Sequence, residues 1–241
     1  MDLKIKDVAD MLNVPEVTIR EWVSEGKIPT YRINRQYRFS RIEIEDWVLK
    51  HQLGKNSPAS PFSTNHADDE PVHEKKNVKG GSKQYSLFRA IHKGGVFLDI
   101  SGETKEDVIR MSMKSIAQEM KLDAEVLTDL LLDRENLQPT ALNNGIGIPH
   151  TRDFLLKDHQ DVVAIVFPKK PIAYGALDGK PVHTLFFLFA CEDKRHLHLL
   201  AKIAHLSSHP ETLAFLQSKP GKESLLKYIQ DWESNIKSQD E

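Results

Sequence analysis

The sequence has few of the features expected of membrane or disulfide-bonded proteins. Its 241 residues include one cysteine, Cys191, so no disulfide can form within the chain. Cys191 follows the apolar run 185–190, where we expect a buried thiol in a reducing environment. That run is far shorter than the ~20 apolar residues of a membrane-spanning helix, and the N-terminus has no apolar signal-peptide core. These absences predict a cytoplasmic protein without membrane insertion.

A strong excess of charge of either sign is also absent. The formal net charge is −2, which excludes a whole-chain bias toward nucleic acid or anionic membranes and leaves only local bias. Apolar residues make up 39% and charged residues 28% of the chain, as is ordinary for a globular protein. The length suits one large domain or two modest ones.

Residues 54–83 are poor in apolar side chains. They are rich in Ser, Pro, Asn, Asp, Lys and Gly, so burial cannot offset the entropy of ordering them, and we predict a flexible linker. His66 and His73 lie there without cysteine or regular ligand spacing, which favours solvated side chains over a metal site. The linker divides the chain into an N-terminal module, 1–53, and a C-terminal domain, 84–235.

The N-terminal module changes period along its length. Apolar residues at helical spacing predict a helix over 5–12, a second opening at Val14-Pro15 and closing at Gly26, and a third after Ser40. Between the last two, apolar and polar residues alternate around a turn at 34–36, which predicts a small β-hairpin, or wing. Two short helices joined by a tight turn and followed by a wing form a winged helix-turn-helix arrangement.

Charge within this module is uneven. Residues 27–41 contain five basic side chains and no acidic ones. A basic wing beside the exposed side of the second helix predicts DNA binding, with the wing on phosphates and the helix in the major groove. The alternative is an interaction module whose arginines form a solvated face. The predicted DNA-binding residues are Thr18, Arg20, Lys27, Arg32, Arg35, Arg38 and Arg41.

The motifs of this module are similar to those of excisionase/MerR-type winged helix-turn-helix domains. They are 8–12, 18–22, 27–29 and 45–48. Such domains usually bind DNA as pairs, so the resemblance implies a homodimer.

The C-terminal domain contains two fully apolar runs of strand length, 162–167 and 184–190. Amphipathic segments flank both, which predicts a layered α/β/α domain. Two helices are predicted from their caps: one begins at Thr104 with Asp107, and the next begins at Asp123 and has the core face Val126, Leu127, Leu130 and Leu131. Three more are predicted from His196 to about Leu206, near 211–216 and near 224–229.

The segment 144–152 presents a histidine on a stiff loop. Gly145 and Gly147 are interpreted as letting another molecule approach the backbone, and Pro149 fixes φ just before His150. Neutral imidazole can attack phosphorus directly, so His150 is a candidate phosphoryl acceptor. A turn with a solvent-exposed or core-satisfied histidine is the alternative.

From about Leu98 to Ile229 the chain resembles fructose/mannitol-type enzyme IIA domains of the bacterial phosphotransferase system, most closely the nitrogen-regulatory branch. The resemblance implies a layered α/β/α enzyme IIA-type fold. It also implies that His150 is phosphorylated, that Arg134 lies beside the phosphoryl group and that His196 is the second active-site histidine. The motifs are 132–136, 144–150, 171–174 with 178–182, and 196–202.

The loop before His150 departs from the family pattern. Residues 138–144 stand where the family has a glycine-rich, serine-containing run, and Thr151 replaces a small glycine. We therefore expect a stiffer, more crowded loop, with Arg152 in place of the usual lysine. The residues expected around the phosphoryl group are Thr140, Asn144, Gly145, Thr151 and Arg152.

No metal or cofactor is expected, because positioned donors suffice for phosphoryl transfer. One histidine-rich set could suggest a zinc site, but its spacing fits no tetrahedral pattern and its cysteine belongs to a predicted strand. That set is His196, His198, His205 and His209 with Cys191.

The sequence thus predicts a phosphohistidine carrier rather than a turnover enzyme. In this interpretation a histidine-phosphocarrier protein phosphorylates His150, and the added charge alters DNA binding. One alternative is a plain phosphocarrier that serves a sugar permease. Another is a non-catalytic regulator that binds an unknown protein partner.

Overall fold

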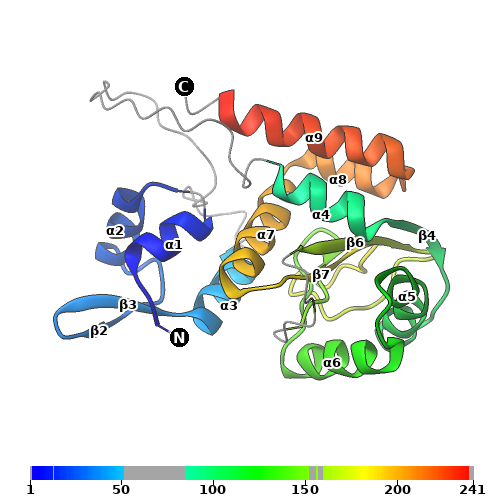
Figure 1. Ribbon diagram of the computed structural model, residues 1–241, viewed down its shortest axis with the longest axis horizontal. Coiled ribbons are helices and arrows are strands. Elements are labelled where there is room, and N and C mark those ends of the chain that lie inside the picture. Colours follow the sequence, from blue (N-terminus) through cyan, green and yellow to red (C-terminus); the bar gives the residue numbers. More distant parts are fainter. Residues whose placement is uncertain (1, 13, 52–84, 152–155, 157–159, 239–241) are drawn as a thin grey trace.

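The computed structural model describes residues 2–12, 14–51, 85–151, 156 and 160–238 (Figure 1). The predicted linker, 54–83, and Arg152 lie outside the described residues. Within the described part of the chain, no helix is long and apolar enough to cross a membrane.

The N-terminal module has the predicted helices and wing. Helices α1 (Ile5–Leu12) and α2 (Glu16–Ser24) precede the hairpin of β2 (Tyr31–Ile33) and β3 (Gln36–Ser40), and α3 (Arg41–His51) follows. Asn34 and Arg35 both have positive φ, 49° and 64°, as a two-residue hairpin turn that matches the strand twist requires. A short strand that was not predicted, β1 (Asp2–Leu3), pairs with β3, giving the order β1-β3-β2.

The C-terminal domain is built on a mixed four-stranded sheet. Its strands are β4 (Val96–Ile100), β5 (Ile146–Gly147), β6 (Val162–Pro168) and β7 (Thr184–Phe189), in the order β4-β6-β7-β5. β6 and β7 are antiparallel, and the two outer pairs are parallel. The strand predictions for β6 and β7 are confirmed, whereas β4 and β5 were not predicted.

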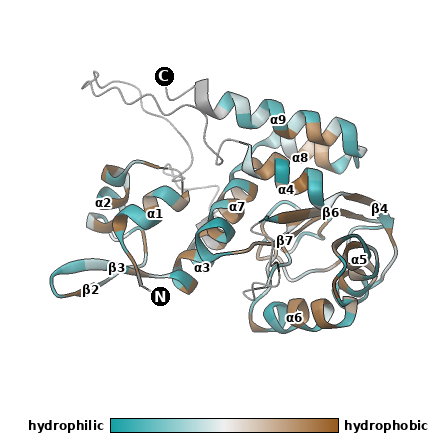
Figure 2. Ribbon diagram, in the orientation of Figure 1, coloured by the Kyte–Doolittle hydropathy of each residue, from teal (hydrophilic) through white to brown (hydrophobic). Residues whose placement is uncertain are grey.

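Both faces of β6 are buried, so its apolar run serves two cores. Val163, Ile165 and Phe167 pack with α4 (Ser86–Gly94), α7 (Asp193–Leu206), α8 (Pro210–Gln217) and α9 (Lys222–Ser238). The alternate residues, Val162 and Val166 among them, pack with α5 (Lys105–Met120) and α6 (Ala124–Leu137). Helices thus cover both faces of the sheet (Figure 1), and its central strands are strongly apolar (Figure 2). The layered α/β/α prediction is confirmed.

The helix caps follow the prediction, but the inward face of α6 does not. Thr104 and Asp107 form a reciprocal capping box on α5, and Asp123 caps α6. Val126, predicted to be in the core, is 52% exposed. The buried side of α6 instead includes Thr128, Arg134 and Glu135 beside its leucines. Arg134 and Glu135 contact the loop before His150, whereas the Thr128 hydroxyl donates to the Ala124 carbonyl oxygen of the same helix.

Cys191 is not buried in a strand as predicted. It lies just beyond the end of β7 and is partly exposed. Its backbone N–H donates to Asp161 Oδ1 (3.2 Å). Burial, together with the nearby Asp161 carboxylate, raises the pKa of the Cys191 thiol, so this thiol is poorly nucleophilic.

The N-terminal module packs directly on the C-terminal domain through α7. Helices α1 and α3 both contact α7, which in turn contacts β7 (Figure 1). The apolar residues of the module form one continuous cluster with those of α7. At the border, Lys194 Nζ lies 2.8 Å from Asp7 Oδ1, and Arg41 Nε lies 3.0 Å from Asp193 Oδ1. The beginnings of α3 and α7 therefore meet, beside the loop that carries His150.

Candidate functional site

The loop before His150 is fixed from behind by α6. The backbone N–H and hydroxyl of Thr140 donate to Glu135 Oε2 at 3.0 and 2.6 Å. Lys105 Nζ approaches the other oxygen of Glu135 at 3.3 Å. Burial raises the pKa of Glu135 despite these contacts. Thr140 therefore positions the loop from a buried network.

The loop glycines serve packing within the chain rather than approach by another molecule. Gly145 has a φ of +80°, and an added Cβ would lie 2.4 Å from His183 Cδ2. A Cβ at Gly147 would lie 2.6 Å from Leu185 Cδ2. The interpretation of these glycines from the sequence is wrong on this point, because β7 and the residue before it occupy the space.

Asn144 and Thr151, which were also predicted around the phosphoryl group, are held within the fold. The backbone N–H of Asn144 donates to Asp178 Oδ2 at 2.8 Å, and Asn144 itself has a φ of 63°. Thr151 is buried directly after His150.

The hydrogen bonds of His150 define which of its ring nitrogens carries the proton. Its Nδ1 lies 2.7 Å from the carbonyl oxygen of Ile148, and because a carbonyl can only accept, Nδ1 carries the proton. The N–H of Leu188 donates to the carbonyl oxygen of Pro149 at 2.9 Å, which ties the loop to β7. Nε2 is therefore the nitrogen that carries the lone pair in the neutral ring.

Arg134 and His196, the two residues that the resemblance implied beside His150, both lie near it in the structure. Arg134 Nη1 donates to the carbonyl oxygen of Gln138 at 3.0 Å, which fixes the guanidinium at the end of α6. His196 lies in the first turn of α7, and its ring centroid is 5.0 Å from that of His150. A helix start favours negative charge. A guanidinium and a helix start thus lie near Nε2, and both are groups that favour negative charge.

Glu45 of α3 fills this site. Its Oε1 lies 3.0 Å from His150 Nε2 and 3.0 Å from Arg134 Nη2. Glu45 and His150 are both 0% exposed. Asp46 of the same helix lies farther away, with Oδ1 3.7 Å from Arg134 Nη2. Two carboxylates of the N-terminal module thus face the guanidinium.

Arg41 adds a second contact from α3. Its Nη2 donates to His196 Nδ1 at 2.7 Å, so Nδ1 is the acceptor and Nε2 of His196 carries the proton. Arg41 was predicted to contact DNA, but its side chain lies on His196 and Asp193. Neither Glu45 nor Arg41 was predicted at this site, because Glu45 belongs to the acidic stretch 43–46 and looks like part of a solvated face.

The same cluster also offers atoms that could ligate a metal. One ligand atom each from Glu45, His150 and His196 lie within 4.8 Å of one another. The Arg134 guanidinium, however, donates to Glu45 Oε1, the oxygen that also contacts His150, and a cation there opposes a divalent ion. The arrangement fits an anion better than a metal.

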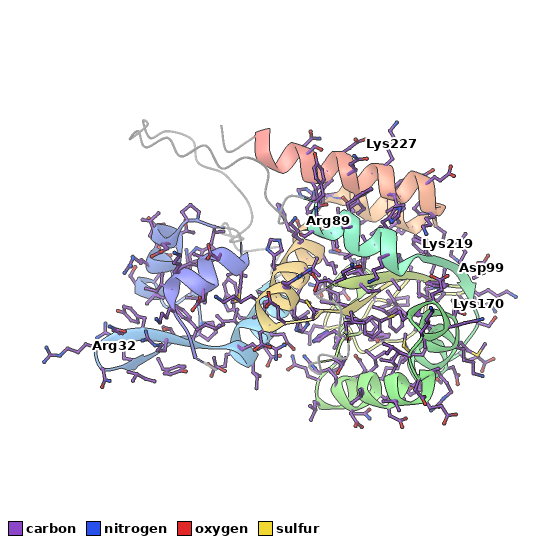
Figure 3. The ribbon with its side chains drawn as sticks, in the orientation of Figure 1. Arg32, Arg89, Asp99, Lys170, Lys219 and Lys227 are labelled. Atoms are coloured by element: carbon purple, nitrogen blue, oxygen red, sulfur yellow. The ribbon has the colours of Figure 1, made fainter. Side chains whose placement is uncertain are left out.

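The predicted DNA-binding residues otherwise lie on an open surface. Arg20, Lys27, Arg32 and Arg35 are exposed, and Thr18 and Arg38 are partly exposed. Figure 3 shows Arg32 projecting from the hairpin, away from the C-terminal domain. The contact with the C-terminal domain therefore leaves this surface uncovered.

Comparison with known proteins gives two matches along the chain. Residues 89–232 match the family described as phosphoenolpyruvate-dependent sugar phosphotransferase system, EIIA 2, and residues 3–52 match a helix-turn-helix domain. The chain is 32% identical over 148 residues to a nitrogen regulatory protein of Pseudomonas aeruginosa, covering 60% of this chain and 95% of that protein. It is 31% identical over 134 residues to a nitrogen regulatory protein of Escherichia coli, covering 54% and 81%.

Among solved structures, the crystal structure of nitrogen regulatory protein IIA-Ntr from Neisseria meningitidis is similar. Its TM-score is 0.54 at 26% identity, over 59% of this chain and 98% of that chain.

Proposed function

The chain belongs to the phosphotransferase system EIIA 2 family and carries an N-terminal helix-turn-helix domain, and from this premise we propose that it is a phosphorylation-responsive DNA-binding regulator. A histidine-phosphocarrier protein transfers a phosphoryl group to His150, and the state of His150 changes how the N-terminal domain binds DNA. We include in the proposal a division at the linker 54–83 and pairing of two chains on DNA.

The observation that carries the proposal is the defined lone pair of His150. With Nδ1–H donating to the Ile148 carbonyl oxygen, Nε2 is the nucleophile. In the transfer, the new P–Nε2 bond forms as the donor's P–N bond breaks, and that electron pair returns to the donor imidazole. The Nδ1–H of His150 stays on the Ile148 carbonyl throughout.

The surrounding donors suit a loose transition state. Charge spreads over the three equatorial phosphoryl oxygens, so positioned cations and N–H groups supply most of the stabilisation. We assign Arg134 and a ring N–H of His196 as these donors, and the start of α7 adds its dipole. Arg152 follows the loop and is proposed to help recruit the anionic group.

The proposal is tested by phosphoryl transfer from labelled phosphoenolpyruvate, with the general phosphotransferase proteins supplied. We expect acid-labile label on the intact chain and none on His150→Ala. Label on His150→Ala would reject His150 as the acceptor and point to another residue. No label on the intact chain at any donor concentration would leave a protein-binding regulator without phosphoryl chemistry.

The link to DNA is tested separately with phosphorylated and unphosphorylated chain at one salt concentration. Fluorescence anisotropy on duplex DNA should give different affinities for the two forms. Equal affinities would reject the coupling while leaving the phosphocarrier chemistry intact.

A further inference from the structure

The carboxylate of Glu45 lies where a phosphoryl group on His150 would lie. We propose that Glu45 is an internal substitute for the phosphoryl group, so that docking of α3 and phosphorylation of His150 exclude one another. This inference rests on the proposed function and names the regulation of the same site: the N-terminal domain is held on the unphosphorylated site and released by phosphorylation.

Glu45 contacts the atom of His150 that would react with phosphorus. Oε1 of Glu45 is 3.0 Å from His150 Nε2, which is hydrogen-bond distance from the atom that must form the P–N bond. His150 is completely buried under this contact. A donor protein cannot reach Nε2 until α3 moves away.

Glu45 also engages the lone pair of His150 Nε2. The ring already uses Nδ1–H for the Ile148 carbonyl oxygen, and a hydrogen bond between Nε2 and Oε1 needs a proton from one partner. Either Nε2 is protonated and donates to the carboxylate, or the carboxyl group donates to the Nε2 lone pair. In both cases the lone pair is engaged, so the docked histidine cannot attack phosphorus.

Charge also opposes docking of α3 once His150 is phosphorylated. Arg134 Nη2 donates to Glu45 Oε1 at 3.0 Å and lies 3.7 Å from Asp46 Oδ1. A phosphoryl group carries about −1.5 to −2 charges near neutral pH, and it would claim the same guanidinium. Glu45 would then lose its partner and face a like charge, which disfavours the docked arrangement.

Contacts between the N-terminal module and α7 that lie away from His150 also stabilise the docked form. The apolar packing of α1 on α7 and the ion pair between Asp7 and Lys194 do not involve Nε2. The hydrogen bond from Lys194 lowers the pKa of Asp7, as expected for a pair that holds its charge. These contacts make docking and phosphorylation compete, and changes in either should shift the other.

The test compares initial rates of His150 phosphorylation by the phosphocarrier protein in the full chain. Glu45→Gln keeps the size but removes the charge that Arg134 holds, and Glu43→Gln is the matched control at an exposed position of the same helix. We expect Glu45→Gln to be labelled faster than wild type by a factor within the ~5–150-fold range typical of coupled sites, with Glu43→Gln unchanged. Equal rates for wild type and Glu45→Gln would overturn the inference.

A charge swap away from His150 provides a second arm. Asp7→Lys should repel Lys194 and speed labelling, and Lys194→Asp in the same chain should restore the slow rate. Failure of the double variant to slow labelling below the single variant would count against docking as the controlling step.

A spectroscopic arm does not need phosphorylation. The imidazole nitrogen signals of His150 should differ between wild type and Glu45→Gln and be unchanged in Glu43→Gln. If no chain takes label, the proposed function fails, while these signals still decide whether Glu45 engages Nε2. Identical His150 signals in wild type and Glu45→Gln would overturn the inference even if labelling succeeds.

Discussion

Substitution of Gly145 by alanine tests how the active loop is held. Gly145 has a φ of +80°, and an added Cβ would lie 2.4 Å from His183 Cδ2, 2.7 Å from its Nε2 and 3.1 Å from the Pro181 carbonyl oxygen. The His183 ring cannot swing away freely, because its Nδ1 is hydrogen-bonded to Thr184 Oγ1 at 2.8 Å. The new methyl group must therefore displace the loop or the start of β7.

The expected loss of stability has two parts. The left-handed conformation costs a residue with a Cβ about 1–2 kcal/mol, and the overlap adds about 1–3 kcal/mol, as for other overpacked sites. Gly145→Ala should therefore lower the free energy of unfolding by about 2–5 kcal/mol. Gly179 isolates the first part, because its φ is +66° and, beyond its two chain neighbours, no atom of the described residues lies within 4 Å of the position that an alanine methyl group would take there.

The assay is urea unfolding of both alanine variants beside wild type, followed by phosphoryl transfer at a temperature where all three are folded. Gly145→Ala should be less stable than Gly179→Ala by about 1–3 kcal/mol and should be labelled more slowly, because Nε2 of His150 is displaced. Equal destabilisation of the two variants would refute the packing role assigned to Gly145.

Three further predictions concern other parts of the molecule. Burial lowers the pKa of His205 to about 4. Between about pH 6.5 and 4 only the unfolded chain therefore binds a proton at this histidine, so the free energy of unfolding falls as the pH falls. In His205→Gln, the fall in the free energy of unfolding from about pH 7 to about pH 4.5 should be smaller by about 2–3 kcal/mol. Thr140→Val removes the hydroxyl that donates to Glu135 Oε2, which should cost about 1–3 kcal/mol and raise the pKa of Glu135 further in an NMR titration. Arg35→Ala at the exposed wing turn should weaken DNA binding on every sequence and lower the salt slope by about 1, with unchanged thermal unfolding.

Much of the fold was predictable because its signals are local. The apolar runs of β6 and β7, the caps of α5 and α6 and the hairpin turn at 34–35 each depend on neighbouring residues. Short elements were missed: β5 spans Ile146–Gly147, too few residues to show a period. The prediction of which residues of α6 face the core was partly wrong, because polar residues share that face and apolar spacing does not reveal them.

The residues of the candidate site likewise include some that the sequence predicts and some that it does not. His150, Arg134 and His196 were predicted from ordered motifs of a known family, and the structure brings them together. Glu45 was not predicted, because its burial depends on a contact with residues far along the chain rather than on its own neighbours. An acidic side chain beside other acidic side chains ordinarily faces water, so sequence pattern alone could not single it out.

The most direct test of the account measures the position of the N-terminal domain before and after phosphorylation. Spin labels at Ser24→Cys on α2 and Ser224→Cys on α9, in a Cys191→Ser background, lie at exposed positions away from His150. Double electron–electron resonance should give a narrow distribution of the distance between the two labels without phosphoenolpyruvate and a broad one when His150 is phosphorylated. An unchanged narrow distribution in fully phosphorylated protein would contradict the account.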